Sequence, residues 1–113
     1  MVSSATAPFY EGIHNLLKSV RDSHGFVRYG ALSNACGAYV RAVLKANNVD
    51  DLFEIQLGAD EVPAAKPEPD GLLQLSREMG NIDPSRCIYI GDSPTDGLAA
   101  SAAGMLGEIH NEY

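Results

Sequence analysis

The chain has 113 residues, of which 45% are hydrophobic and 20% are charged, and this balance predicts one globular domain rather than a disordered chain. A net charge of −7 without any basic stripe argues against a nucleic-acid partner. No apolar run approaches the roughly 18 residues of a membrane span, and the leading MVSSATAP does not resemble a signal peptide. Cys36 and Cys87 form no CxxC motif, which favours a reducing, cytoplasmic setting.

The first half of the chain alternates helical and extended patterns. Residues 1–8 are predicted to be a lead-in, and residues 9–113 are predicted to form the domain. Apolar residues recur at helical spacing from Phe9 to about His24. The next elements predicted are a strand at 26–33, a helix at 36–47 and a strand at 53–57.

The second half repeats this alternation. A turn-rich segment at 58–68 is followed by a helix that begins near Pro69 and stops at Gly80. After it come a turn at Asp83-Pro84, a strand at 87–91, a helix from Pro94 to about Ala103, and the short, polar GEIHNEY, a weak candidate for a further strand. Helices that cross between parallel strands predict an α/β fold, which binds its ligands beyond the carboxyl ends of the strands.

The segment CIYIGDSPTD, residues 87–96, places Asp92 at the end of an apolar strand and Asp96 four residues later. Gly91 allows a tight turn there, and Tyr89 is expected to pack in the core. Two carboxylates at a strand end suit Mg²⁺, which prefers one or two carboxylates with several waters. A structural alternative is an Asx turn at Asp92 with Asp96 capping the next helix.

Two further segments carry polar residues. Lys66 precedes a rigid Pro-x-Pro element, which would hold its ammonium group in place for a phosphate or a carboxylate; the alternative is an exposed loop lysine. Ser33 and Asn34 lie where a strand ends and a helix begins, and a hydroxyl beside the amides of a helix start can bind an anion. The alternative for this pair is a helix N-cap.

These three groups follow one another in chain order as Ser33, Lys66-Pro67-x-Pro69 and Gly91-Asp92-x-x-x-Asp96. The combination closely resembles the second, third and fourth motifs of the haloacid dehalogenase superfamily, in its phosphatase branch, and is most similar to phosphoglycolate phosphatases and their close relatives. The resemblance runs from about residue 8 to residue 105. It implies a Rossmann-like parallel sheet with flanking helices and a Mg²⁺-dependent reaction on a small phosphorylated metabolite.

The resemblance also implies roles for the matched residues. Ser33 would donate a hydrogen bond to the transferring phosphoryl group, helped by the amide of Asn34. Lys66 would hold the nucleophile and the phosphate together. Asp92 would ligate Mg²⁺ directly, and Asp96 would orient the metal site from close by.

The family's first motif, Asp-x-Asp-x-Thr/Val, is missing, and the chain contains no Asp-x-Asp at all. Its first aspartate would form the aspartyl-phosphate and its second would act as acid and base. In the family, the strand that carries this motif lies between the strand that ends at Ser33 and the strand that ends at Gly91. We therefore expect an incomplete fold without this central strand and without the helical cap, and with open strand edges that favour association with a second copy or strand exchange.

Two hypotheses follow. The first is a phosphatase of the haloacid dehalogenase type, present here as a truncated chain that is inactive because the nucleophile is missing. The second is a non-catalytic module derived from the same fold, which binds phosphate, Mg²⁺ or another protein.

Overall fold

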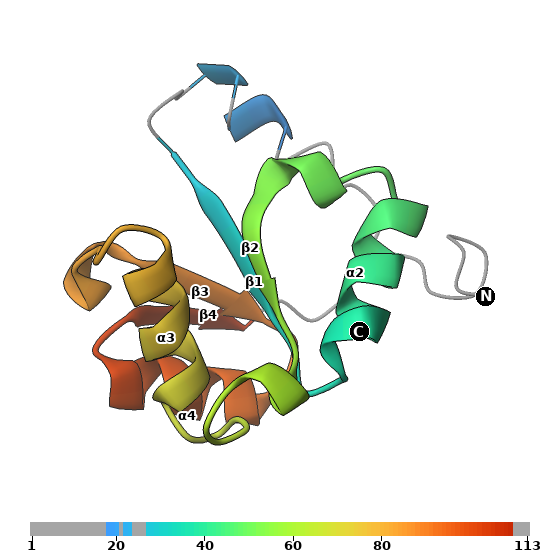
Figure 1. The fold of residues 1–113 in the computed structure, drawn as a ribbon. Coiled ribbons are helices and arrows are strands. Elements are labelled where there is room, and N and C mark those ends of the chain that lie inside the picture. Colours follow the sequence, from blue (N-terminus) through green and yellow to red (C-terminus); the bar gives the residue numbers. More distant parts are fainter. Residues whose placement is uncertain (1–17, 21, 24–26, 110–113) are drawn as a thin grey trace.

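The structure is a computed structural model that describes residues 18–20, 22–23 and 27–109. Its strands and helices, shown in Figure 1, are β1 (Tyr29–Leu32), α2 (Gly37–Ala46), β2 (Phe53–Leu57), α3 (Asp70–Glu78), β3 (Ile88–Gly91), α4 (Pro94–Ala103) and β4 (Leu106–Ile109). Short 3-10 helices lie at Asp50–Leu52, Ala59–Glu61 and Pro84–Arg86. The predicted lead-in and most of the helix predicted from Phe9 to His24 lie outside the described residues, although 18–20 and 22–23 are helical.

The predicted order of strands and helices is confirmed from β1 to α4. β2 and α4 have the predicted limits, and the other elements are shorter than predicted by a few residues at their ends. The weak candidate GEIHNEY does contribute to a strand, because Leu106–Ile109 form β4 in parallel register with β3; residues 110–113 lie outside the described residues. Backbone pairing makes this strand, and its close packing needs a small residue: a Cβ on Gly107 would lie 3.1 Å from the Cβ of Ala100 on α4.

The four strands form two separate parallel pairs instead of one continuous sheet. β1 pairs with β2 and β3 pairs with β4, and no described strand joins β1 to β3. This confirms the expectation of an α/β fold with parallel strands. The described elements also include no helical cap.

Helices cover both faces of the first pair of strands but only one face of the second (Figure 1). α2 packs on one face of β1 and β2 through the buried Val40 and Leu44. On the opposite side, α3 and α4 form the larger core around Leu72. On β3, Ile88 and Ile90 are 62% and 50% exposed. Among the helices of the described part, none is long and apolar enough to cross a membrane.

Leu72 of α3 is expected to be the side chain on which the larger core depends most, since it is 1% exposed. Leu72→Ala should lower the free energy of unfolding by about 2–5 kcal/mol, because it removes buried methyl groups and leaves a cavity. Leu98→Ala is the matched control on α4, where the side chain is 61% exposed and should change the same quantity little. Urea denaturation followed by circular dichroism measures both, and equal losses would contradict this account of the core.

Candidate active site

The polar residues predicted from the three motifs lie together in space. Ser33, Lys66, Asp92 and Asp96 all line one cleft of about 1150 Å³ that runs between β1 and β3. They come from the carboxyl ends of β1 and β3, from the loop before α3 and from the first turn of α4. This is the edge at which an α/β sheet binds its ligands.

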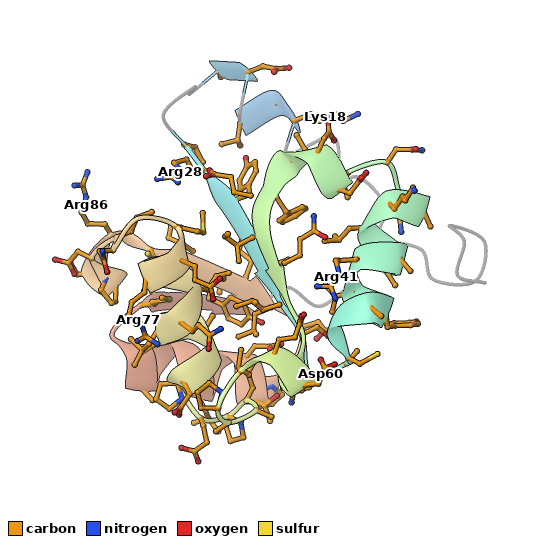
Figure 2. All side chains as sticks on the ribbon, viewed as in Figure 1. Lys18, Arg28, Arg41, Asp60, Arg77 and Arg86 are labelled. Atoms are coloured by element: carbon orange, nitrogen blue, oxygen red, sulfur yellow. The ribbon has the colours of Figure 1, made fainter. Side chains whose placement is uncertain are left out.

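The ammonium group of Lys66 is buried. Its Nζ donates to Asp96 Oδ1 at 2.5 Å and to the hydroxyl oxygen of Tyr89 at 2.7 Å. The side chain is only 9% exposed, so the alternative of an exposed loop lysine is wrong. In contrast, the labelled Arg28, Arg77 and Arg86 of Figure 2 lie on the outside of the molecule.

The side chain of Asn34 holds the backbone of Lys66 through two hydrogen bonds. The Lys66 N–H donates to Asn34 Oδ1 at 3.0 Å, and Asn34 Nδ2 donates to the Lys66 carbonyl at 3.2 Å. The side chain of Asn34 therefore positions Lys66, whereas the sequence indicated a role only for the Asn34 backbone amide. The N-cap of α2 is Cys36, an exposed free thiol, so neither Ser33 nor Asn34 is the helix N-cap.

Asp96 has a structural and an electrostatic role at once. Its Oδ2 accepts hydrogen bonds from the backbone N–H groups of Asp92 at 3.0 Å and Ser93 at 3.2 Å, which closes the start of α4. Its Oδ1 accepts from Lys66. The turn requires a glycine before Asp92, because a Cβ on Gly91 would overlap the Asp96 side chain.

The pKa values of the pair favour the charged forms. Burial alone would lower the pKa of Lys66, but the hydrogen bonds to Asp96 and Tyr89 outweigh it and raise that pKa. Burial alone would raise the pKa of Asp96, but the hydrogen bond and the charge of Lys66, with the backbone N–H groups, lower it. The ammonium and the carboxylate therefore remain an ion pair across the neutral pH range.

Tyr89 is the site residue that the sequence missed. Its hydroxyl accepts from Lys66 and donates to the carbonyl oxygen of Leu32 at 3.0 Å. Burial raises its pKa, while Lys66 opposes that rise. The apolar strand pattern predicted that Tyr89 packs in the core, which it does, but no sequence signal indicated that its hydroxyl would reach Lys66.

The fit to a divalent cation rests on few protein ligands. Within residues 18–20, 22–23 and 27–109, no group of three or more His, Cys, Asp or Glu side chains comes together. Asp92 is exposed at the end of the cleft, and both oxygens of Asp96 accept hydrogen bonds from the protein. One carboxylate with waters and a substrate phosphate still suits Mg²⁺, because this ion keeps several waters and uses one or two carboxylates.

Comparisons with known proteins agree with this fold. The model of the haloacid dehalogenase-like hydrolase family matches residues 2–104. The phosphoglycolate phosphatase of Haemophilus influenzae is 34% identical over 95 residues, which are 84% of this chain and 41% of that protein. The phosphoglycolate phosphatase of Escherichia coli K12 is 37% identical over 75 residues, which are 66% of this chain and 29% of that protein.

Solved structures show the same likeness. A hydrolase of the haloacid dehalogenase superfamily from Geobacter sulfurreducens superposes with a TM-score of 0.75 at 32% identity, covering 86% of this chain and 44% of that one. Parallel strands with flanking helices define an α/β protein. More specifically, the chain belongs to the haloacid dehalogenase-like hydrolase family, and it spans less than half the length of these relatives.

The ion pair predicts a pH dependence of stability. Because the pKa of Asp96 is below its ordinary value of 3.8, the stabilisation is complete at higher pH and is lost as the pH falls through the folded-state pKa. At pH 6, Asp96→Asn should lower the free energy of unfolding by about 3–5 kcal/mol, since it leaves the Lys66 ammonium buried without its partner. This difference from the unmodified chain should shrink as the pH is lowered toward 2.

Urea denaturation at several pH values measures this effect. Lys66→Met should remove the same pH-dependent contribution to the free energy of unfolding. The double variant, Lys66→Met with Asp96→Asn, then gives the interaction energy of the ion pair. A difference between the unmodified chain and Asp96→Asn that is as large at pH 2 as at pH 6 would contradict the assignment.

Proposed function

We propose that this chain is the phosphate-binding and metal-binding part of a Mg²⁺-dependent phosphatase that acts on a small phosphorylated metabolite. The observation that carries the proposal is the Lys66 ammonium, held by Asp96 and Tyr89 at the end of a cleft that Ser33 and Asp92 also line. A fixed cation beside hydrogen-bond donors neutralises the charge on a transferring phosphoryl group. The names of the relatives make phosphoglycolate the first substrate to test.

Ser33 is suited to contact the phosphoryl oxygens. Its Oγ accepts a hydrogen bond from the N–H of Ala35 at 3.1 Å, which holds the hydroxyl at the end of β1. An oxygen that accepts this bond keeps its own proton to donate. We assign this proton and the backbone amide of Asn34 to the phosphate, while Lys66 supplies the positive charge.

Asp92 and Asp96 take different parts at the metal site. We assign Asp92 as the ligand, because its side chain is exposed at the mouth of the cleft, and Asp96 as the residue that orients the loop. When bound, Mg²⁺ would offset negative charge on the phosphoryl oxygens. Lys66 would keep the phosphate and the nucleophile together.

The nucleophile has to come from outside this sequence, which has no Asp-x-Asp. In the reaction that the family resemblance implies, a carboxylate oxygen attacks phosphorus while the bond from phosphorus to the ester oxygen breaks, and the leaving oxygen takes a proton. Water then hydrolyses the aspartyl-phosphate to the carboxylate and inorganic phosphate. We therefore propose that the 113-residue chain alone does not turn over.

A non-catalytic module is the second candidate. The missing nucleophile and the split sheet favour it, because a chain in this state could bind phosphate, Mg²⁺ or a protein without reacting. For either function we propose a cytoplasmic setting, supported by the free thiols of Cys36 and Cys87.

A chimera tests the phosphatase proposal. This chain replaces the matched region of the Haemophilus influenzae phosphoglycolate phosphatase, and hydrolysis of p-nitrophenyl phosphate and phosphoglycolate is measured with and without Mg²⁺. We expect Mg²⁺-dependent turnover, because the relative supplies the missing part. Lys66→Met and Asp92→Asn should each lower kcat/KM by about 10²–10³-fold through lost charge stabilisation.

Lys45→Met is the matched control, because Lys45 is exposed in the last turn of α2 and should leave turnover unchanged. The isolated chain is assayed beside the chimera. Turnover by the isolated chain that Asp92→Asn abolishes would contradict the external nucleophile. A folded chimera that never turns over would reject the phosphatase proposal and leave the binding module.

A further inference from the structure

The loop that joins β1 to α2 carries Ser33 and Asn34, and the segment that follows β2 holds this loop in place. Ser33 N donates to Leu57 O at 3.1 Å, and Ala59 N donates to Ala35 O at 2.9 Å. These bonds continue the pairing of β1 with β2 past the end of β1. The position of the loop therefore depends on the segment after β2.

α2 is capped by a residue from that segment. Within the described part of the chain, the N-cap residue Cys36 makes no side-chain capping bond, and the first turn of α2 has no acidic residue. The carboxylate comes from Asp60, whose Oδ1 accepts a hydrogen bond from Gly37 N at 2.7 Å. A carboxylate is stabilising there, because the first N–H groups of a helix lack partners within it and the helix dipole is positive at this end.

Glu61 makes a second contact beside Asp60. Its Oε1 accepts hydrogen bonds from Gly58 N at 3.0 Å and from the guanidinium of Arg41 on α2 at 3.1 Å. The bonds from Arg41 and from the Gly58 N–H lower the pKa of Glu61, so this side chain is charged at neutral pH. Figure 2 shows Arg41 and Asp60 between α2 and the segment after β2, which the two carboxylates join.

The two segments lie too close together for a side chain to fit between them. A Cβ on Gly58 would overlap the backbone N of Gly37 and the carbonyl oxygen of Ala35. A Cβ on Gly37 would overlap the Glu61 carboxylate. Contacts this close transmit a displacement from one segment to the other, because close-packed atoms leave no space to absorb it.

The loop is joined to Lys66 through Asn34. The Asn34 side chain holds the Lys66 backbone through two hydrogen bonds, and the Ser33 hydroxyl lies one residue earlier in the same loop. The Lys66 ammonium is fixed separately, by Asp96. A shift of the loop relative to β2 would therefore change the distance between the Ser33 hydroxyl and the ammonium group.

We propose that Asp60, together with Glu61, is a positioning residue for the phosphate site, because it sets where Ser33 and Asn34 lie relative to Lys66. Asp60 acts through α2 and the loop, and not on the phosphate itself. The link to phosphate rests on the proposed function, whereas the control of the loop by Asp60 does not.

Nuclear magnetic resonance of the full 113-residue chain, without phosphate or Mg²⁺, tests the control of the loop. Asp60→Ala removes the carboxylate that caps α2. This variant should shift the resonances of the Asn34 side-chain amide and of the Lys66 N–H, because both groups take part in the bonds between these two residues.

Amide hydrogen exchange of the same samples measures how firmly the loop is held. In Asp60→Ala, the N–H groups of Ser33 and Ala59 should exchange about fivefold faster, which is the fold-change that corresponds to the loss of a typical helix cap. These two groups make the backbone bonds between the loop and the segment after β2.

Two further variants separate positioning from a general loss of stability. Asp60→Asn keeps an oxygen that can accept from Gly37 and should restore the resonances of the unmodified chain. Asp83→Ala is the matched control, because Asp83 caps the short helix before β3 by accepting from Ser85 N at 2.9 Å. This control removes a cap of the same kind and should leave the resonances of the loop unchanged.

The chimera with the Haemophilus influenzae phosphatase gives a kinetic readout. Asp60→Ala in the chimera should lower kcat for p-nitrophenyl phosphate about tenfold and change KM less, because a misplacement of about 1 Å can cost roughly 10²-fold in rate. Asp60→Asn should recover most of this loss, and Asp83→Ala should leave kcat unchanged.

The other outcomes overturn the inference in different ways. Unchanged Asn34 and Lys66 resonances in Asp60→Ala would show that Asp60 does not control the loop, and equal shifts in Asp83→Ala would show only general loosening. Shifted resonances with full turnover of the Asp60→Ala chimera would limit Asp60 to the fold. If Asp60→Ala does not fold, Asp60→Ser takes its place, because its shorter side chain draws the oxygen away from α2.

Failure of the proposed function has a different signature. An unmodified chimera that is folded but never turns over would reject the phosphatase proposal, and the link from Asp60 to phosphate would be rejected with it. The resonance shifts of Asp60→Ala would still decide whether Asp60 controls the loop, so the two failures are distinguishable.

Discussion

The ion pair between Lys66 and Asp96 is the interaction on which the rest of the structure depends. Lys66 follows β2 in the chain, and Asp96 follows β3, so their contact at 2.5 Å joins the two pairs of strands. The hydrogen bond from Tyr89 to the Leu32 carbonyl makes a second link between the same halves. A buried ammonium group needs a paired carboxylate, because an unpaired buried charge is strongly destabilising. Here the paired ammonium of Lys66 also lies where we propose that phosphate binds.

The site and the stability of the fold therefore use the same atoms. One carboxylate oxygen of Asp96 accepts hydrogen bonds from the backbone N–H groups of the loop, and the other accepts one from Lys66. The same side chain therefore fixes both the start of α4 and the position of the ammonium group. Asn34 fixes Lys66 from its backbone side. The proposed phosphate site would need little rearrangement, because its dipoles and its positive charge are already placed. The cleft beside it lies between the two pairs of strands that the structure describes.

Most of the fold could be predicted because its signals are local. The local sequence predicted a strand at 53–57 and a helix from Pro94 to about Ala103, and the structure confirms both as β2 and α4. β4 was only a weak candidate because its sequence is short and polar. Its strand character comes from pairing with β3, and the lack of a side chain on Gly107 lets it lie close to Ala100. The roles of Tyr89 and of the Asn34 side chain were missed for a related reason. Both reach residues far away in the sequence, and no local pattern records such contacts.

The sequence by itself determined the order of the elements, the residues at the strand ends and the absence of an Asp-x-Asp, because these follow from residue type and spacing. Only the tertiary structure decided which of those residues meet. It buried Lys66 against Asp96, where the sequence also allowed an exposed loop lysine, and it placed β1 and β3 on either side of a cleft. The physical reason is that burial and strand pairing are properties of segments brought together from distant parts of the chain.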